Sequence, residues 1–288
     1  EMYDKGKFSD CLSVREHLLT AMQHVFGHEH TDVAAGLDNI GVVYRDLGKL
    51  PEALAKHDEA LRIRSKLGDD HIDVATSLMN IGNVHFSQGK YDLALAKHEE
   101  SLQIKIKVLG HEHIDVAKSL ANIGLVYQDL GKLPEALAKH DEALRIFRSN
   151  LGDDHIDVAK SLEGIGLVYR NLGRYEEALA QHNEALRISR SKLGDDHKDV
   201  AASLLNLGSV YWNLGNLREA QTKYDEALRI QIKVLGHDHT DVAASLLNIG
   251  SVYLDLGNYE EALEKFNEAL RIQRSKLGDD HIRRPISG

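Results

Sequence analysis

The sequence predicts an all-α solenoid of stacked helix–turn–helix repeats, and three features support this. A near-identical motif recurs six times, its spacing is almost constant, and each copy holds two segments whose apolar residues recur at helical intervals. Successive copies are 41 residues apart once and 42 residues apart four times. A fixed period in this range is typical of a solenoid, in which each repeat buries its apolar face only against its neighbours. A marker glycine identifies each copy: Gly41, Gly82, Gly124, Gly166, Gly208 and Gly250.

The first helix of a repeat is predicted over residues 32–47, where apolar residues recur every three or four positions. Asp32 lies in the opening turn, where a negative charge is favourable near the positive end of the helix dipole. Gly48 ends the helix, because glycine readily adopts the left-handed conformation. The apolar positions are Val33, Leu37, Ile40, Tyr44 and Leu47.

The second helix is predicted from Leu50 to about Lys66, with Pro51 tolerated in its first turn. Residues 67–71 then form the turn into the next repeat, and each helix exceeds 14 residues. His57 lies in the apolar stripe of this helix, and later repeats place aromatic residues there. We therefore interpret the position as a packing position, occupied in turn by His57, His98, His140, His182, Tyr224 and Phe266.

The composition excludes several classes of function. The net charge is −10 and the pI is near 5.9, so the chain does not resemble nucleic-acid-binding proteins, which usually carry a clustered basic face. Cys11 is the only cysteine, which excludes an intrachain disulfide and favours a reducing compartment, the cytoplasm. No apolar run approaches the roughly 18 residues that span a bilayer, and no signal-peptide pattern opens the chain, so we expect no membrane partner.

The repeat resembles the tetratricopeptide pattern L-x2-[LI]-G-x2-Y…A…A, which implies a right-handed superhelix of helical hairpins. The matching residues are Leu37, Ile40, Gly41, Tyr44, Gly48, Ala53 and Ala60. The repeat is longer than the usual 34 residues, and the extra residues lie within 64–75. This longer form is similar to the repeats of kinesin light chains and nephrocystin-type proteins over residues 6–281, although no heptad coiled coil is present.

We divide the chain into a partial N-terminal repeat over residues 1–30, six repeats over residues 31–281, and a C-terminal tail over residues 282–288. The N-terminal segment is expected to hold the end of a first helix, up to about Gly6, and then a second helix to about Phe26. A seventh repeat begins at residue 277, but Pro285 blocks its first helix.

The last helix, expected from about Tyr259 to Lys276, therefore lacks a neighbour on one side. We expect this uncapped surface to bear Ala262, Phe266 and Ala269. It is either a boundary of the chain studied or a surface for end-to-end self-association, because solenoids generally need polar terminal caps.

First helices of stacked hairpins are expected to line a concave groove, in which three positions vary between repeats. These lie three before, one after and four after the marker glycine. They are either solvent-exposed sites that drift or groove contacts that differ by repeat, and we favour the groove. Trp212, in the last of these positions, either anchors a partner or packs beside Tyr211. The first position holds Asp38, Met79, Ala121, Glu163, Leu205 and Leu247, and the last includes Arg45, Arg170 and Trp212.

An asparagine stands two residues before the marker glycine in five repeats: Asn39, Asn80, Asn122, Asn206 and Asn248. Asparagine is mildly unfavourable inside a helix, so its recurrence indicates a role. Its amide offers two donors and an acceptor, suited either to a peptide backbone or to a hydrogen bond between helices. The resemblance implies the first role, because asparagines at this position contact bound peptide in related domains.

The resemblance also implies that a bound peptide has an acidic segment. Lys118 and Asn122 lie one helical turn apart and resemble a carboxylate clamp, while Lys160 and Arg170 add positive charge in the following repeat. Glu163 partly offsets this charge.

Catalysis, metals and cofactors are not expected. Histidines recur in the same turn of every repeat, as a pair at His28/His30, His111/His113 and His237/His239 and singly in the other repeats. They are therefore spread along a row, whereas a metal needs three or four ligands at one point. Nucleophile motifs, phosphate-binding loops and paired carboxylates outside the repeat pattern are absent from the sequence.

The sequence therefore predicts a non-catalytic adaptor that binds a peptide of a partner protein in a concave groove. The alternatives are a structural solenoid that assembles end to end, and a sensor segment of a larger signalling protein.

Overall fold

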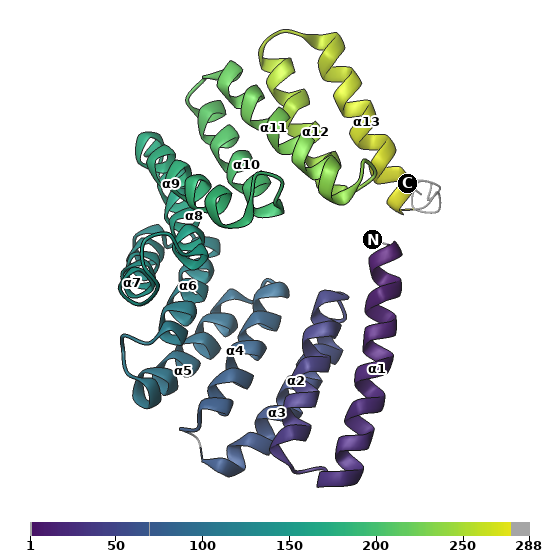
Figure 1. Ribbon diagram of the computed structural model, residues 1–288, viewed down its shortest axis with the longest axis vertical. Helices are drawn as coiled ribbons and strands as arrows, with labels where there is room; N and C mark the ends of the chain where they lie inside the picture. Colours follow the sequence, from purple (N-terminus) through teal and green to yellow (C-terminus); the bar gives the residue numbers. More distant parts are fainter. Residues whose placement is uncertain (1, 69, 278–288) are drawn as a thin grey trace, which may run out of the picture. The chain divides into compact units, whose positions relative to one another are not determined.

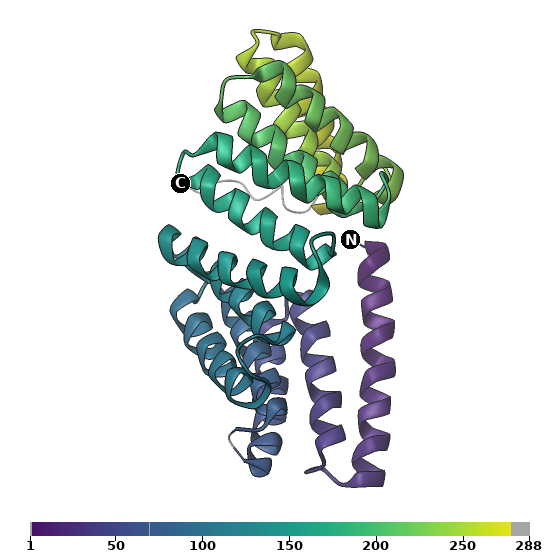
Figure 2. The same ribbon diagram turned by 60° about the vertical axis from the view of Figure 1, so that its left-hand side comes forward.

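A computed structural model describes residues 2–68 and 70–277, and within these residues the chain consists of helices and short turns (Figures 1 and 2). No helix in this part of the chain is both long and apolar enough to cross a membrane. The helices are α1 (Met2–Phe26), α2 (Thr31–Asp46), α3 (Leu50–Arg64), α4 (Ile72–Ser87), α5 (Tyr91–Leu109), α6 (Ile114–Asp129), α7 (Leu133–Leu151), α8 (Ile156–Asn171), α9 (Tyr175–Leu193), α10 (Lys198–Asn213), α11 (Leu217–Leu235), α12 (Thr240–Asp255) and α13 (Tyr259–Leu277).

The chain divides into an N-terminal unit, Met2–Asn150, and a C-terminal unit that starts at Leu151. In the N-terminal unit the hairpins are α2–α3, α4–α5 and α6–α7, and in the C-terminal unit they are α8–α9, α10–α11 and α12–α13. Within each unit a second helix also packs on the next first helix, as α3 does on α4 and α9 on α10. This confirms the predicted all-α solenoid of paired helices.

The marker glycines bring the two helices of each hairpin together. A Cβ atom on Gly208 would lie 2.5 Å from Cε1 of Tyr224, and one on Gly124 would lie 2.7 Å from Nε2 of His140. Both aromatic side chains are buried, so they have little freedom to move away. The prediction that this second-helix position serves packing is confirmed, because its ring fills the space that the glycine leaves.

Each first helix begins at a histidine N-cap, a feature that the sequence analysis missed. In repeat 3, Nδ1 of His113 accepts a hydrogen bond of 3.1 Å from the main-chain N–H of Asp115. Such a bond satisfies one of the donors that a helix leaves unpaired in its first turn. Gly48, with φ of 73°, ends the first helix of repeat 1 as predicted. The capping histidines are His30, His71, His113, His155, His197 and His239.

The N-terminal segment differs from the prediction, because α1 is one continuous helix that passes through Gly6. It packs on α2 as a second helix packs on the next first helix. Leu19 is buried against Val33 and Ala34, and the Tyr44 hydroxyl donates a hydrogen bond of 2.9 Å to Glu16.

The last helix has the predicted extent, but its exposed surface differs from the prediction. Ala262 and Ala269 are buried, and Phe266 packs on Gly250 of α12. The large apolar side chains that α13 exposes are Tyr259, Leu263 and Leu270. The predicted seventh repeat would begin at Leu277, the last residue of α13; the rest of its start, residues 278–281, and the predicted C-terminal tail, residues 282–288, lie outside the described residues.

Candidate functional site

The first helices of each unit form a surface that we call the first-helix face: α2, α4 and α6 in the N-terminal unit, and α8, α10 and α12 in the C-terminal unit. In the C-terminal unit a cavity of about 240 Å³ lies between α8 and α10, and one of about 360 Å³ lies between α10 and α12. Asp199 and Ala202 of α10 line both cavities. The two cavities therefore flank the same helix and form a row across this face.

Four of the five predicted asparagines have side-chain amides that form no hydrogen bond with the described residues. They are exposed or half-buried, so their two donors and one acceptor remain accessible to a ligand. Asn206 differs, because its Nδ2 donates a 2.6 Å hydrogen bond to Glu163 across the α8–α10 boundary. The unpaired amides are those of Asn39, Asn80, Asn122 and Asn248.

The predicted cationic residues differ in whether their side chains already have ion-pair or hydrogen-bond partners. Nζ of Lys118 lies 3.0 Å from Asp115, and the guanidinium of Arg45 lies 2.9 Å from Asp46. Arg170 donates a long hydrogen bond of 3.4 Å to Asn171. Lys160 forms no ion pair with the described residues, and it lines the 240 Å³ cavity together with Asn206. Lys160 and Asn206 are thus the two predicted residues that the structure brings to one cavity.

Trp212 lies on α10 with 36% of its surface exposed. Its Nε1 donates a 2.6 Å hydrogen bond to Asp255 of α12. The ring therefore connects two neighbouring first helices and also presents apolar surface to solvent.

The position three before the marker glycine is not simply exposed, which corrects the groove prediction for Asp38. Asp38 is only 5% exposed, and its carboxylate accepts a 2.6 Å hydrogen bond from Nδ1 of His57 on the second helix. Glu163 accepts a similar bond of 2.7 Å from Nδ1 of His182. An acidic residue here is therefore bound within its own hairpin by the packing histidine.

A second set of variable residues was missed, because it lies on the second helices. These residues stand 23 positions after the marker glycine, and those in repeats 1 to 5 are buried. Nζ of Lys105 donates a 2.8 Å hydrogen bond to the hydroxyl of Ser119, and Gln231 accepts one of 2.6 Å from Ser245. The position therefore reaches the next first helix, and it is occupied by Arg64, Lys105, Phe147, Ser189 and Gln231.

The signal for these contacts is present in the sequence as a serine five residues before the marker glycine. Ser77, Ser119, Ser161, Ser203 and Ser245 hold this position in repeats 2 to 6. Gln231 and Ser189 line the 360 Å³ and 240 Å³ cavities, respectively. In these two repeats the second helix thus supplies part of the cavity wall.

Burial shifts the pKa of several groups beneath the first-helix face. It lowers the pKa of His98 and of His140 to about 4, so both imidazoles are neutral near pH 7. Burial also lowers the pKa of the Lys105 ammonium. These groups act in packing and in helix-to-helix hydrogen bonds.

The turn histidines do not converge on a common point. Nε2 of His111 lies 2.9 Å from Glu142, and Nε2 of His237 lies 2.9 Å from Glu268, each within its own part of the array. Across the described residues, no group of three or more histidine, cysteine, aspartate or glutamate side chains could hold a metal ion.

Three solved structures with similar folds are each below 25% identical to the chain. The apo form of RapI matches with a TM-score of 0.71 and 18% identity, over 96% of this chain and 95% of that one. BtubC (BKLC) from P. vanneervenii matches with a TM-score of 0.68 and 20% identity, over 80% of this chain and 92% of that one. A putative kinesin light chain from Podosopora anserina, with nearly identical TPR-like repeats, matches with a TM-score of 0.60 and 23% identity, over 72% of this chain and 98% of that one. No curated protein matches the chain.

The sequence pattern of the tetratricopeptide repeat matches six overlapping segments. They are residues 2–66, 32–107, 73–149, 115–191, 157–221 and 199–275. Together with the helical hairpins and the close packing at each marker glycine, these matches show that the chain belongs to the tetratricopeptide repeat family.

Proposed function

We propose that the chain is a non-catalytic scaffold whose first-helix face binds an extended peptide segment of a partner protein. The unpaired amides of Asn39, Asn80, Asn122 and Asn248 carry this proposal. A peptide main chain presents N–H and C=O groups at regular intervals, and each amide can pair with both kinds of group. Such contacts supply affinity without selecting side chains.

Selectivity would come from groups that differ between repeats. The cavities on either side of α10 have different linings, with Glu163 and Ser189 in one and Leu205 and Gln231 in the other. In the N-terminal unit, Lys118 is 53% exposed, so its ammonium can leave Asp115 for a carboxylate of the ligand. We therefore propose an acidic residue in the part of the ligand that contacts α6. A single cysteine supports a cytoplasmic location.

A random peptide library tests the proposal. Peptides are selected for binding to the parent chain, and their affinities are then measured for the parent and for the Asn122→Ala and Lys118→Ala variants. Peptides that bind the N-terminal unit should lose about tenfold in affinity in each variant, since a hydrogen bond to a charged group contributes about 1.5–3 kcal/mol and a neutral one somewhat less. Selected peptides that bind both variants as tightly as the parent would contradict a role for this pair.

End-to-end self-association is a second candidate, favoured by one observation. Tyr259, Leu263 and Leu270 expose a row of apolar surface on α13, at positions where Leu133, Leu137 and Leu144 of α7 are half-buried or buried. Sedimentation over a hundredfold range of concentration tests this candidate. A chain that remains monomeric throughout removes it, and a Leu263→Glu variant should suppress any association that is seen.

A further inference from the structure

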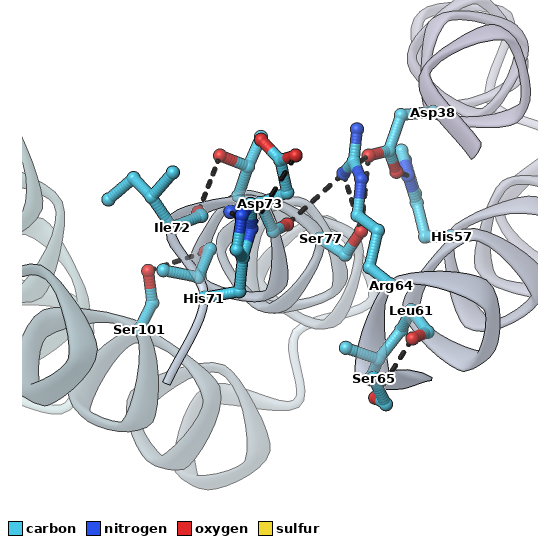
Figure 3. Close-up of polar contacts among 12 residues, drawn as sticks. Asp38, His57, Leu61, Arg64, Ser65, His71, Ile72, Asp73, Ser77 and Ser101 are labelled. Carbon is cyan, nitrogen blue, oxygen red and sulfur yellow. Dashed lines mark hydrogen bonds and ion pairs between the residues drawn. The ribbon is translucent and has the colours of Figure 1, made fainter. Parts of the chain in front are cut away.

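Repeat 1 contains a buried arginine, Arg64, whose guanidinium is surrounded by hydrogen-bond acceptors. The guanidinium of Arg64 contacts the carboxylate of Asp38, donates a 2.8 Å hydrogen bond to the hydroxyl of Ser77 and donates one of 3.2 Å to the main-chain oxygen of Asp73 (Figure 3). His57 holds the carboxylate from the other side. Arg64 and Asp38 are each 5% exposed, so the charges are paired out of contact with water.

The same acceptors recur between α8 and α10, but the arginine does not. Counted from the marker glycines, Glu163 corresponds to Asp38, and a serine replaces the arginine. Glu163 is held by Nδ1 of its histidine at 2.7 Å, as Asp38 is. The remaining correspondences are His182 with His57, Asp199 with Asp73, Ser203 with Ser77, and Ser189 with Arg64.

The 240 Å³ cavity lies where these residues meet. Glu163, Ser189, Asp199 and Ser203 all line it. Exposed Lys160 and Ala202 line it too, so the cavity opens onto the first-helix face. Replacing an arginine by a serine at the second-helix position accounts for the space, because the long side chain that fills it in repeat 1 is missing.

Several polar atoms of this cavity have no partner within the described chain. Oε1 of Glu163 is buried and accepts no hydrogen bond, while its Oε2 accepts from His182 and Asn206. Ser189 and Ser203 are 3% and 2% exposed, and neither hydroxyl forms a hydrogen bond among the described residues. Unpaired buried polar groups are costly, and a buried carboxylate is the costliest of these.

We propose that the cavity between α8 and α10 is a subsite for an arginine side chain of the bound segment. The proposal rests on the proposed peptide-binding function and adds the chemistry of one ligand residue. The ligand guanidinium takes the place that Arg64 takes in repeat 1, donating to Oε1 of Glu163, the Ser203 hydroxyl and the main-chain oxygen of Asp199. A guanidinium offers five N–H donors in a fixed plane, which suits several acceptors better than the compact ammonium of lysine does.

The first test uses the chain without any ligand. In a Ser189→Arg variant the new side chain should occupy the cavity and bind Glu163. Amide exchange in α8 and α10 should slow by about tenfold or more, since a charge-assisted hydrogen bond of 1.5–3 kcal/mol corresponds to at least that factor. Ser189→Met is the matched control, because it fills the cavity without a donor and should slow exchange less. Exchange in Ser189→Arg that equals or exceeds that of the parent would overturn the complementarity.

The second test uses peptides selected from the random library on the parent chain. Those that bind the C-terminal unit should share an arginine, and replacing it by citrulline, which keeps the shape but loses the charge, should weaken binding at least tenfold. The difference between arginine and citrulline peptides should vanish in Ser189→Arg and in Glu163→Gln. Binders of this unit without a shared arginine, or with equal affinity after the exchange to citrulline, would overturn the subsite.

The two tests also separate failure of the subsite from failure of the proposed function. If the library yields no binder, the proposed peptide-binding function is contradicted. A peptide arginine is then also ruled out as the group that enters the cavity. The exchange behaviour of Ser189→Arg then still decides whether the cavity accepts this group.

Discussion

Removing Asp38 should destabilise the junction of repeats 1 and 2 strongly. In an Asp38→Ala variant, the guanidinium of Arg64 keeps its contacts to the Ser77 hydroxyl and the main-chain oxygen of Asp73, but it loses its only carboxylate among the described residues. Nδ1 of His57 loses its 2.6 Å partner as well. Breaking a buried ion pair by removing one member costs about 3–5 kcal/mol, because a charge stays buried without compensation.

Amide exchange measured by mass spectrometry suits this prediction, since a repeat array need not unfold in one step. Peptides from α2 and α4 should exchange about 10²- to 10⁴-fold faster in Asp38→Ala than in the parent, the factor that corresponds to this free energy. Peptides from α12 serve as an internal reference.

A double variant provides the matched control. Repeat 3 has Ala121 and Phe147 at the positions of Asp38 and Arg64, so Asp38→Ala with Arg64→Phe copies an arrangement that the chain already uses. Replacing a buried ion pair by apolar residues is often neutral, so the double variant should recover most of the loss. If Asp38→Ala alone changes local exchange by less than about fivefold, or the double variant exchanges as fast as the single one, the buried-pair reasoning is refuted.

Three further predictions concern packing and capping. The pKa of His98 and of His140 is about 4 in the folded chain, below the ordinary value of 6.5. The free energy of unfolding should therefore be highest above pH 6.5 and should fall by up to about 3 kcal/mol per histidine as the pH drops to 4. In a variant with both His98→Phe and His140→Phe, the urea concentration at the midpoint of unfolding should depend less on pH across this range. Gly208→Ala should lower the melting temperature, because its Cβ would lie 2.5 Å from buried Tyr224 and overpacking of about 1–3 kcal/mol outweighs a gain of about 1 kcal/mol in helix propensity; a higher melting temperature would contradict the close packing. His113→Ala should cost about 1 kcal/mol and His113→Asn much less, as unfolding in urea would show, and equal losses would argue against the capping role.

The repeat pattern was sufficient to predict the helices, because each helix boundary recurs in six copies of the repeat and can be compared among them. α13 was expected from about Tyr259 to Lys276 and ends at Leu277. The N-terminal helix was predicted less well, since Gly6 was interpreted as a break between two helices. A glycine inside a helix costs only about 1 kcal/mol, so α1 can continue through Gly6 without a turn.

The candidate site was predicted only in part. The recurring asparagines could be assigned to one face of the first helices from the sequence, because the period of a helix determines which of its residues share a face. The roles of Arg64 and Ser189 could not be predicted in that way, since only residues of the first helices are expected to line the groove. Whether its side chain reaches the next first helix depends on how hairpins stack, and that geometry is not contained in the pattern of one helix.

The affinity of one selected peptide for two variants of the last repeat tests the central claim most directly. Asn248 lies on the first helix α12 with an unpaired amide, whereas Asn267 is an exposed asparagine on the second helix α13. For a peptide that contacts the C-terminal unit, we predict that Asn248→Ala weakens binding by about tenfold, the loss of one or two hydrogen bonds of about 1 kcal/mol each, while Asn267→Ala leaves it unchanged. Equal affinities for the parent and Asn248→Ala, or a loss confined to Asn267→Ala, would contradict binding at the first-helix face.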